Sequence, residues 1–135
     1  MTSPEIPAMG QPRDERYVDG HFGDASFRGQ DLVAADFSRA DARAADFSDA
    51  DLSGALFCAT DLRGADLRGA RLQEANLEWA NLEWANLEWA DLKGANLSKA
   101  NLQCANLSGA NVTDEQLAQA KSLKGATMPD GTKHE

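Results

Sequence analysis

The stretch ANLEWANLEWANLEWADL, which occupies residues 75–92, decides the fold. Its residues are good helix formers, so an amphipathic helix is the first possibility. At about 100° per residue, however, a five-residue step moves each Leu about 140° around the helix axis, and no apolar stripe forms. A flat strand fails as well, because side chains alternate with period two and an odd repeat sends successive leucines to opposite faces. The chain must therefore turn within every five residues.

The same five-residue unit runs without a gap from Gly20 to Asp114. The central residue is Leu, Phe or Val in eighteen of the nineteen units, and the residue two places before it is Ala in sixteen. Asp or Asn stands between these two in fifteen units. Because side chains alternate along an extended segment, Ala and the central residue point inward and Asp or Asn points outward. The last two residues then form a corner, where glycines such as Gly64 and Gly69 supply the positive φ that tight turns favour.

These units resemble the pentapeptide-repeat family, whose pattern A(D/N)LXX matches 95 of the 135 residues. The resemblance implies an all-β fold, a right-handed quadrilateral β-helix (a β-solenoid) with four units in each coil. The residues alone predict an inward side, an outward side and a turn in each unit, and they leave three or four corners open. With four corners, residues twenty apart stack at the spacing of adjacent strands, about 4.8 Å.

The C-terminal end of such a solenoid needs a cover, because a terminal coil exposes unpaired backbone groups. The segment Thr113-Asp114-Glu115-Gln116 has the pattern of a capping box, so we expect a capping helix and tail over residues 115–135. From Ser122 onward we expect an extended piece with a turn at Pro129-Asp130-Gly131.

At the N-terminal end, Tyr17 stands five residues before the first central residue and is expected to close the first coil. The solenoid is thus predicted to span residues 15–114. Residues 1–14 contain three prolines and no apolar pattern, so we expect them to be disordered.

Two irregular core positions are predicted to be structural. Ala42 is small for a central residue, but Phe37 and Phe47 belong to the same coil and their rings can fill the space. Thr60 replaces an inward Ala, and its hydroxyl needs a partner, most simply a neighbouring carbonyl oxygen.

Composition and charge limit the function. The net charge is -9 and the pI is near 4.6, so the protein as a whole repels nucleic acid backbones and anionic membranes. We therefore expect neither as a direct partner. The longest apolar run, Ala55 to Ala59, is far shorter than the roughly 18 residues that span a bilayer. The first residues lack a basic region followed by an apolar stretch, so we expect no secretory signal and a cytoplasmic location.

No motif predicts catalysis, a metal site or a cofactor. Cys58 and Cys104 form no cluster with His21 or His134, and every Asp that could act as a base has equivalents in other units. We therefore expect a protein that is not an enzyme and that binds no cofactor and no metal. The two cysteines are 46 residues apart, more than two coils, so we expect free thiols.

Six aspartates are the first candidate interaction surface. With a twenty-residue coil they form three stacked pairs, Asp31 on Asp51, Asp41 on Asp61, and Asp46 on Asp66. One interpretation is an acidic surface for a basic partner. The other is structural, because Asp suits an outward position before a turn and neighbouring arginines dilute the field.

Three tryptophans are the second candidate. Trp79, Trp84 and Trp89 occupy the same corner position of consecutive units and form a belt around one coil. Trp is favoured at interfaces, so one of the three can anchor a partner. Alternatively the three ANLEW copies reflect tandem duplication, with each indole lying over small neighbours such as Gly64 or Gly69.

Two functions remain open from the sequence. The first is a rigid scaffold that binds an unknown protein partner through its outer faces, as a monomer or as a homodimer through one end of the solenoid. The second comes from the resemblance: some pentapeptide-repeat proteins mimic duplex DNA, bind DNA gyrase, and confer quinolone resistance or regulate the enzyme. Such rods are usually longer and dimerise through C-terminal helices, so the scaffold is the preferred hypothesis.

Overall fold

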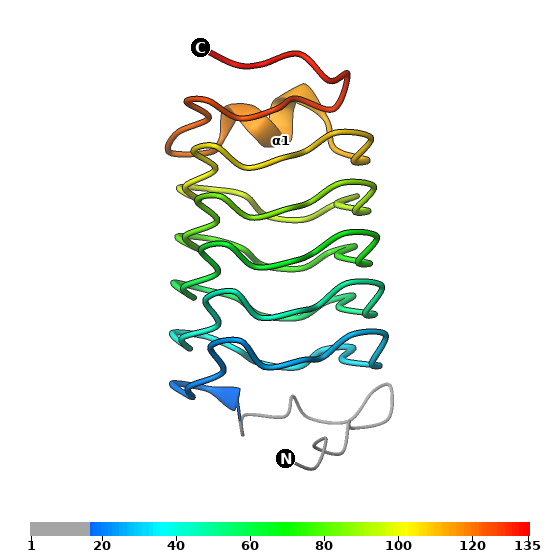
Figure 1. The fold of residues 1–135 in the computed structure, drawn as a ribbon, viewed down its shortest axis with the longest axis vertical. Coiled ribbons are helices and arrows are strands. Elements are labelled where there is room, and N and C mark those ends of the chain that lie inside the picture. The colour runs from blue at the N-terminus through cyan, green and yellow to red at the C-terminus, as the bar shows by residue number, and fades with distance from the viewer. Residues whose placement is uncertain (1–16) are drawn as a thin grey trace.

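The computed structural model describes residues 17–135, which wind into a stack of square coils (Figure 1). The predicted disorder of residues 1–14 lies outside the described residues. Parallel bridges join residues twenty apart along the whole stack, for example Asp41 with Asp61 and Asn81 with Asn101. A period of twenty residues means four units in each coil, so the quadrilateral expectation is confirmed.

Each wall of the square is held by short ladders rather than by long strands. In one wall, Leu62 N donates to Asn81 O at 2.8 Å, and Asn81 N donates to Thr60 O at 2.9 Å. Each bridge is only one residue long, because the chain must turn again after three extended residues. The stack is therefore stabilised by the repetition of one small pattern, and every unit contacts the equivalent units in the coils before and after it.

The corners impose the same backbone conformation on every unit. Ala65 N donates to Leu62 O at 3.0 Å and closes a tight turn whose third residue is Gly64. Gly64 has φ +68, and positive φ recurs at every fifth residue from Asp19 to Gly109. Many of these residues are not glycine, and an L side chain in this region costs about 1–2 kcal/mol.

Ala44 and Ala45 allow this cost to be measured. Ala44 is an exposed corner residue with φ +57, whereas Ala45 points inward and is fully buried. We expect Ala44→Gly to raise the free energy of unfolding by about 0.5–1 kcal/mol, because Gly adopts positive φ without a steric penalty. We expect Ala45→Gly to lower it by about 1–2 kcal/mol, because it removes a buried methyl group. Urea unfolding followed by circular dichroism compares the two, and a loss of stability in both variants would contradict the strain argument.

The inside of the solenoid is filled by the inward Ala and the central residues, which are almost entirely buried. In the N-terminal coils the central residues are aromatic. Rings one coil apart stack, with Phe27 and Phe47 at 5.1 Å between centroids, whereas rings on opposite walls meet edge to face, with Phe37 and Phe47 at 5.4 Å. Ala42, in the same coil as Phe37 and Phe47, is fully buried. Tyr17 is buried as well and stacks on Phe37 at 4.4 Å.

Most units have Ala two residues before the central residue. Among residues 17–135, Thr60 is the one buried residue at this place that carries a hydroxyl. Its Oγ1 donates to Phe37 O at 2.7 Å, so the predicted carbonyl partner is confirmed.

Helix α1, Asp114–Ala118, covers part of the last coil. The predicted capping box is present, because Thr113 Oγ1 accepts from Gln116 N at 3.1 Å and Gln116 Oε1 accepts from Thr113 N at 2.9 Å. The Gln116 amide also donates to Leu92 O at 2.7 Å and to Ala95 O at 3.0 Å. Leu92 O also accepts the turn hydrogen bond from Ala95 N at 2.9 Å, whereas Ala95 O has no backbone donor from a following coil among residues 17–135, so Gln116 caps both the helix and this edge of the solenoid.

After α1 the chain pairs again with the preceding coil, which the sequence analysis did not predict. Ser122 bridges to Asn101 and Thr127 to Asn106, each twenty-one residues on rather than twenty. The extra residue reflects the replacement of an ordinary corner by the helix. Thr127 then pairs with Lys133 in an antiparallel bridge around the expected turn at 129–131, and this hairpin forms the C-terminal end of the stack (Figure 1).

Candidate interaction surface

The three aspartate columns are stacked as predicted, because the bridges pair Asp31 with Asp51, Asp41 with Asp61, and Asp46 with Asp66. Each carboxylate also performs a local task. The Oδ1 atom accepts the backbone N–H two residues later, as Asp46 does from Ser48 at 2.9 Å. Asn makes the same contact, since Asn81 Oδ1 accepts from Glu83 N at 3.1 Å. This shared hydrogen bond explains the Asp or Asn preference without a ligand.

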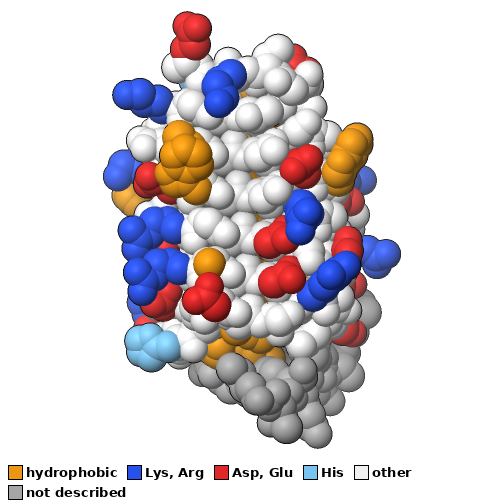
Figure 2. Space-filling model, in the orientation of Figure 1, with side chains coloured by type: hydrophobic (Ala, Val, Ile, Leu, Met, Phe, Trp, Pro, Cys, Tyr) orange, Lys and Arg blue, Asp and Glu red, His pale blue; other side chains and the backbone are white. Residues whose placement is uncertain are grey.

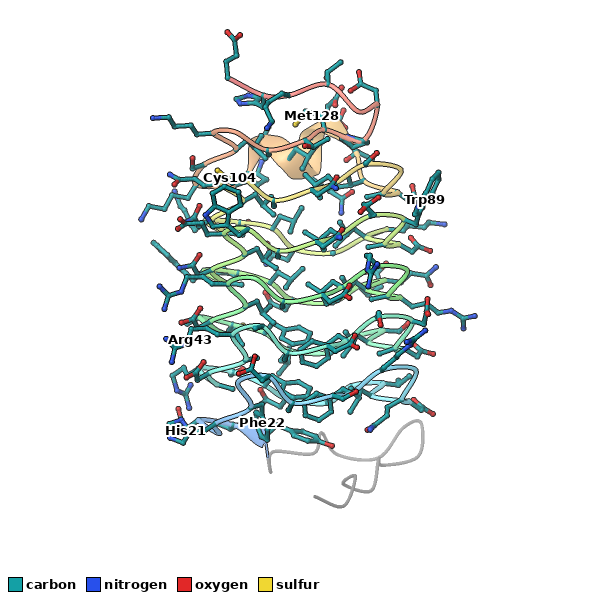
Figure 3. All side chains as sticks on the ribbon, in the orientation of Figure 1. His21, Phe22, Arg43, Trp89, Cys104 and Met128 are labelled. Atoms are coloured by element: carbon teal, nitrogen blue, oxygen red, sulfur yellow. The ribbon has the colours of Figure 1, made fainter. Side chains whose placement is uncertain are left out.

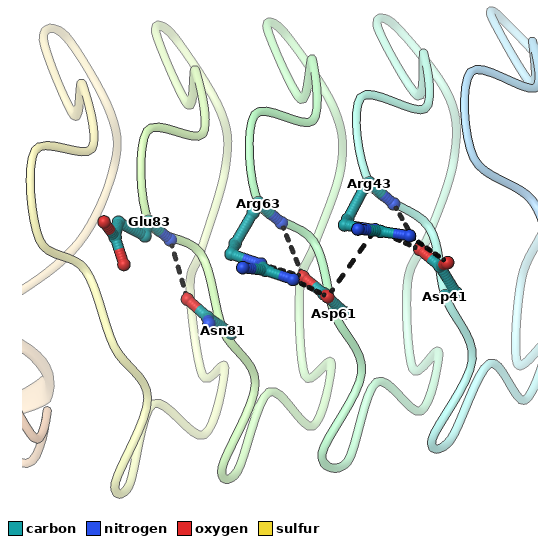
Figure 4. A network of polar contacts seen from close by, with 6 residues as sticks. All are labelled: Asp41, Arg43, Asp61, Arg63, Asn81 and Glu83. Carbon is teal, nitrogen blue, oxygen red and sulfur yellow. Dashed lines mark hydrogen bonds and ion pairs between the residues drawn. The ribbon is translucent and has the colours of Figure 1, made fainter.

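Arginines pair with four of the six carboxylates, and the longest of these contacts joins Arg71 to Asp51 at 3.9 Å. Arg43 binds Asp41 at 2.9 Å, Arg63 binds Asp61 at 2.7 Å and Arg68 binds Asp66 at 2.6 Å. Arg43 also approaches Asp61 of the next coil at 3.8 Å. Charges of alternating sign therefore follow one another along the wall that contains units 40–44 and 60–64 (Figure 4). The surface is therefore a mixed ladder rather than a continuous acidic strip, and its role in binding stays a prediction.

These pairs alter the titration of the carboxyl groups. The hydrogen bond from the Arg43 guanidinium lowers the pKa of Asp41 from 3.8 to about 2. Arg63 and Arg68 lower the pKa values of Asp61 and Asp66 in the same way. A carboxyl whose pKa is lower in the folded protein stabilises the fold above its unfolded pKa and loses that contribution as the pH falls through the folded value.

We therefore expect the melting temperature to fall as the pH is lowered from about 4 to about 2, since these carboxylates lose their charge in that window. Circular dichroism melts across this range measure the effect. The variant with Arg43→Gln, Arg63→Gln and Arg68→Gln is the comparison, because without the guanidinium groups the three pKa values return toward those of the unfolded chain. This variant should lose less stability on acidification than the wild type, and an equal loss in both would contradict the assignment.

The three tryptophans stand out from the wall at three corners of one coil. Trp79, Trp84 and Trp89 have exposed fractions of 57%, 68% and 72%, and they are the large hydrophobic side chains that are exposed among residues 17–135. Each has a positive φ between +62 and +64. Figure 3 shows Trp89 projecting from the edge of the stack toward its C-terminal end. The predicted belt is therefore present, and its function stays a prediction.

The indoles do not lie over Gly64 or Gly69, so that expectation was wrong. Trp89 lies over Gly109 in the following coil, where an added Cβ would stand 2.5 Å from the Trp89 ring. Nothing lies within 4 Å of the equivalent point on Gly64. The reason is that corner side chains lean toward the C-terminal coil, as Asp49 also does over Gly69.

A shallow hollow of about 300 Å³ lies on the N-terminal side of Trp89. Its lining residues come from four successive coils, and they are Arg28, Ser48, Asp49, Arg68, Gly69 and Trp89. The sequence analysis did not identify Asp49. Written in rows of twenty, the sequence places Asp49, Gly69 and Trp89 in one corner column, so the signal was present.

Residues 17–135 contain no group of three His, Cys, Asp or Glu side chains that could hold a metal ion, and none of their helices is long and apolar enough to cross a membrane. Cys58 and Cys104 are both free, as predicted.

Comparison with known proteins agrees with the fold. The family model for pentapeptide repeats matches with 8 copies over residues 21–57, 50–88 and 80–114, which together span more than half of the 135 residues. No curated protein matches the sequence.

The solved structures that are similar to this one include two pentapeptide repeat proteins. A pentapeptide repeat protein from the thylakoid lumen of Arabidopsis thaliana is 32% identical, with a TM-score of 0.63, over 76% of this chain and 74% of that one. A pentapeptide repeat protein from the cyanobacterium Cyanothece 51142 is 35% identical, with a TM-score of 0.60, over 76% of this chain and 66% of that one. These likenesses confirm the right-handed β-helix, and together with the repeat itself they show that the chain belongs to the pentapeptide-repeat family.

Proposed function

We propose that this protein is a non-catalytic scaffold that binds another protein through the outer wall of its solenoid at the tryptophan corners. The observation that carries the proposal is the exposure of three indoles on an otherwise polar surface. Figure 2 shows hydrophobic side chains at both edges of the visible wall, surrounded by charged and uncharged polar groups. Exposed Trp is costly in water, and it contributes more to interfaces than most residues do.

The backbone supports the same proposal. Each Trp occupies a corner with positive φ, a position where Gly is the least strained residue and where other coils do use Gly, as at Gly64 and Gly69. Packing inside the protein does not require an indole there, because the side chains point outward and are mostly exposed. The coil below holds each corner rigidly, so a partner would meet the rings with little loss of conformational entropy.

The test is affinity capture from the native host with the intact protein and with a variant that carries Trp79→Ala, Trp84→Ala and Trp89→Ala. We expect a protein that the wild type retains and the variant does not. The matched control replaces three other exposed outward side chains, as Glu74→Ala, Gln73→Ala and Lys93→Ala. A partner that binds the triple Trp variant as well as the wild type would overturn the proposal.

Mimicry of duplex DNA is the second candidate, and the stacked carboxylates of Asp41, Asp46, Asp61 and Asp66 are the observation that favours it. It is the weaker candidate, because arginines neutralise three of these four groups. Mimicry predicts inhibition of gyrase supercoiling that disappears when the four residues are changed to Asn. Unimpaired supercoiling at micromolar protein would exclude it.

A further inference from the structure

One wall of the solenoid has an exposed Trp at each of its two edges. It consists of the units 45–49, 65–69, 85–89 and 105–109, stacked one above another, and we call it the Trp84–Trp89 wall. Trp84 is the last residue of unit 80–84, and Trp89 is the last residue of unit 85–89, which belongs to this wall. The two rings therefore flank residues 85–88. They are also the two most exposed indoles, at 68% and 72%. This wall therefore offers a partner two aromatic contacts on one flat side.

Three carboxylates that form no ion pair within residues 17–135 stand near these two rings in the chain or in the same corner column. Glu83 precedes Trp84, Glu88 precedes Trp89, and Asp49 lies two coils below Trp89 in its corner column. None of the three lies within 4 Å of a Lys or Arg nitrogen of residues 17–135, and Glu88 accepts only an amide hydrogen bond from Asn86 at 3.1 Å. The nearest arginine of the wall, Arg68, is neutralised by Asp66. Arg63 and Arg68 attract Glu83 and Glu88, but each arginine is already paired with an aspartate of its own unit, so the surroundings of the rings keep a net negative charge.

The hollow beside Trp89 provides a place for a side chain. Gly69 forms its floor, Trp89 its C-terminal side, and Asp49 leans over the floor from the N-terminal side. An aromatic ring and a carboxylate that face one space are the elements that hold an ammonium or guanidinium group, through a cation–π contact and an ion pair. Two arginines also line the hollow, but Arg68 is paired with Asp66 at 2.6 Å and Arg28 comes from the first described coils, so the cation belongs at the Trp89 end.

We propose that the Trp84–Trp89 wall binds a basic peptide segment of a partner protein, with one Lys or Arg side chain in the hollow between Trp89 and Asp49. A second cationic side chain contacts Trp84 and Glu83. The net charge of -9 steers such a segment toward the protein. This inference rests on the proposed function, and it adds the sign of the partner's charge and the residues that bind the charged side chains.

The test is calorimetric titration of the intact protein with acetylated hexa-arginine amide, and with hexa-glutamate as the opposite probe. Trp89→Ala and Asp49→Asn are the test variants. Glu74→Ala is the matched control for Trp89, because it shortens an exposed corner side chain with positive φ that does not border this wall. Asp31→Asn is the matched control for Asp49, because it removes one exposed charge from another wall and Asn preserves the hydrogen bond that Asp31 accepts from Val33.

We expect each test variant to weaken hexa-arginine binding about threefold to tenfold and each control to change it by less than about twofold. Equal weakening in all four variants would overturn the proposal, because the probe would then respond to net charge alone. Tighter binding of hexa-glutamate would overturn it too, because the hollow would then bind an anionic side chain through Arg28. If the captured partner requires the tryptophans but tolerates Asp49→Asn, the proposed function stands and this inference fails.

Discussion

Deleting residues 115–135 is expected to make the protein aggregate and to lower its melting temperature. The deletion removes Ser122 and Thr127, which pair with Asn101 and Asn106, so two walls of the last full coil lose their final ladder partners. It also removes Leu117, which is 97% shielded from solvent and belongs to the core cluster. A free β edge beside newly exposed leucines invites pairing with other copies of the chain. Light scattering and a circular dichroism melt measure both effects.

The control for this deletion is Gln116→Ala, which leaves the hairpin in place. It removes the amide that binds Leu92 O and Ala95 O, together with half of the capping box. We expect a loss of about 1–3 kcal/mol in the free energy of unfolding and no aggregation, because Asn101 and Asn106 keep their pairs with Ser122 and Thr127. If the truncated protein scatters no more light than the full chain and melts at the same temperature, the end segment is not a cap.

Phe37→Ala is expected to lower the free energy of unfolding by about 3–5 kcal/mol. The ring of Phe37 lies between Tyr17 at 4.4 Å and Phe57 at 5.2 Å, both in stacked geometry, and it also meets Phe47 edge to face. Its removal leaves a cavity that the neighbouring Ala columns cannot close, since they already contribute only methyl groups. Loss of the N-terminal coils ahead of the rest is the expected mode of failure, because each coil contacts only its neighbours.

Phe37→Leu is the matched control, since Leu77 and Leu97 occupy the same column in later coils. We expect a cost below about 1.5 kcal/mol, because most of the volume is retained. Chemical unfolding monitored by circular dichroism and by protection of amide hydrogens compares the two variants. If Phe37→Ala costs no more than Phe37→Leu, the aromatic stack is not what fills the first coils.

The five-residue period allowed the inside and outside of this protein to be predicted, because a strict inward and outward alternation leaves little freedom for Ala and the central residue. The carbonyl partner of Thr60 followed from the same reasoning. The number of corners did not, since a turn in each unit is compatible with three or four, and the family resemblance supplied it. The predicted capping box at Thr113 was correct because its two hydrogen bonds are local.

The features that the sequence analysis missed depend on contacts between coils. The lean of Trp89 toward Gly109 reflects the direction of a side chain at a left-handed corner, which residue spacing alone does not predict. The return of the ladder at Ser122 was hidden by the helix, which shifts the register by one residue.

The square coil has a consequence for how such a gene can change length. Twenty added residues would insert one complete coil, and every later side chain would keep its place in the same corner or wall. Five added residues, such as one more ANLEW copy, would instead rotate everything downstream by a quarter turn. Trp89 would then project from the next corner of the coil, while the buried contacts of the duplicated unit stayed the same. Slippage between near-identical repeats therefore reorients a surface at almost no energetic cost to the interior, and a binding face of this protein can be redirected without being rebuilt.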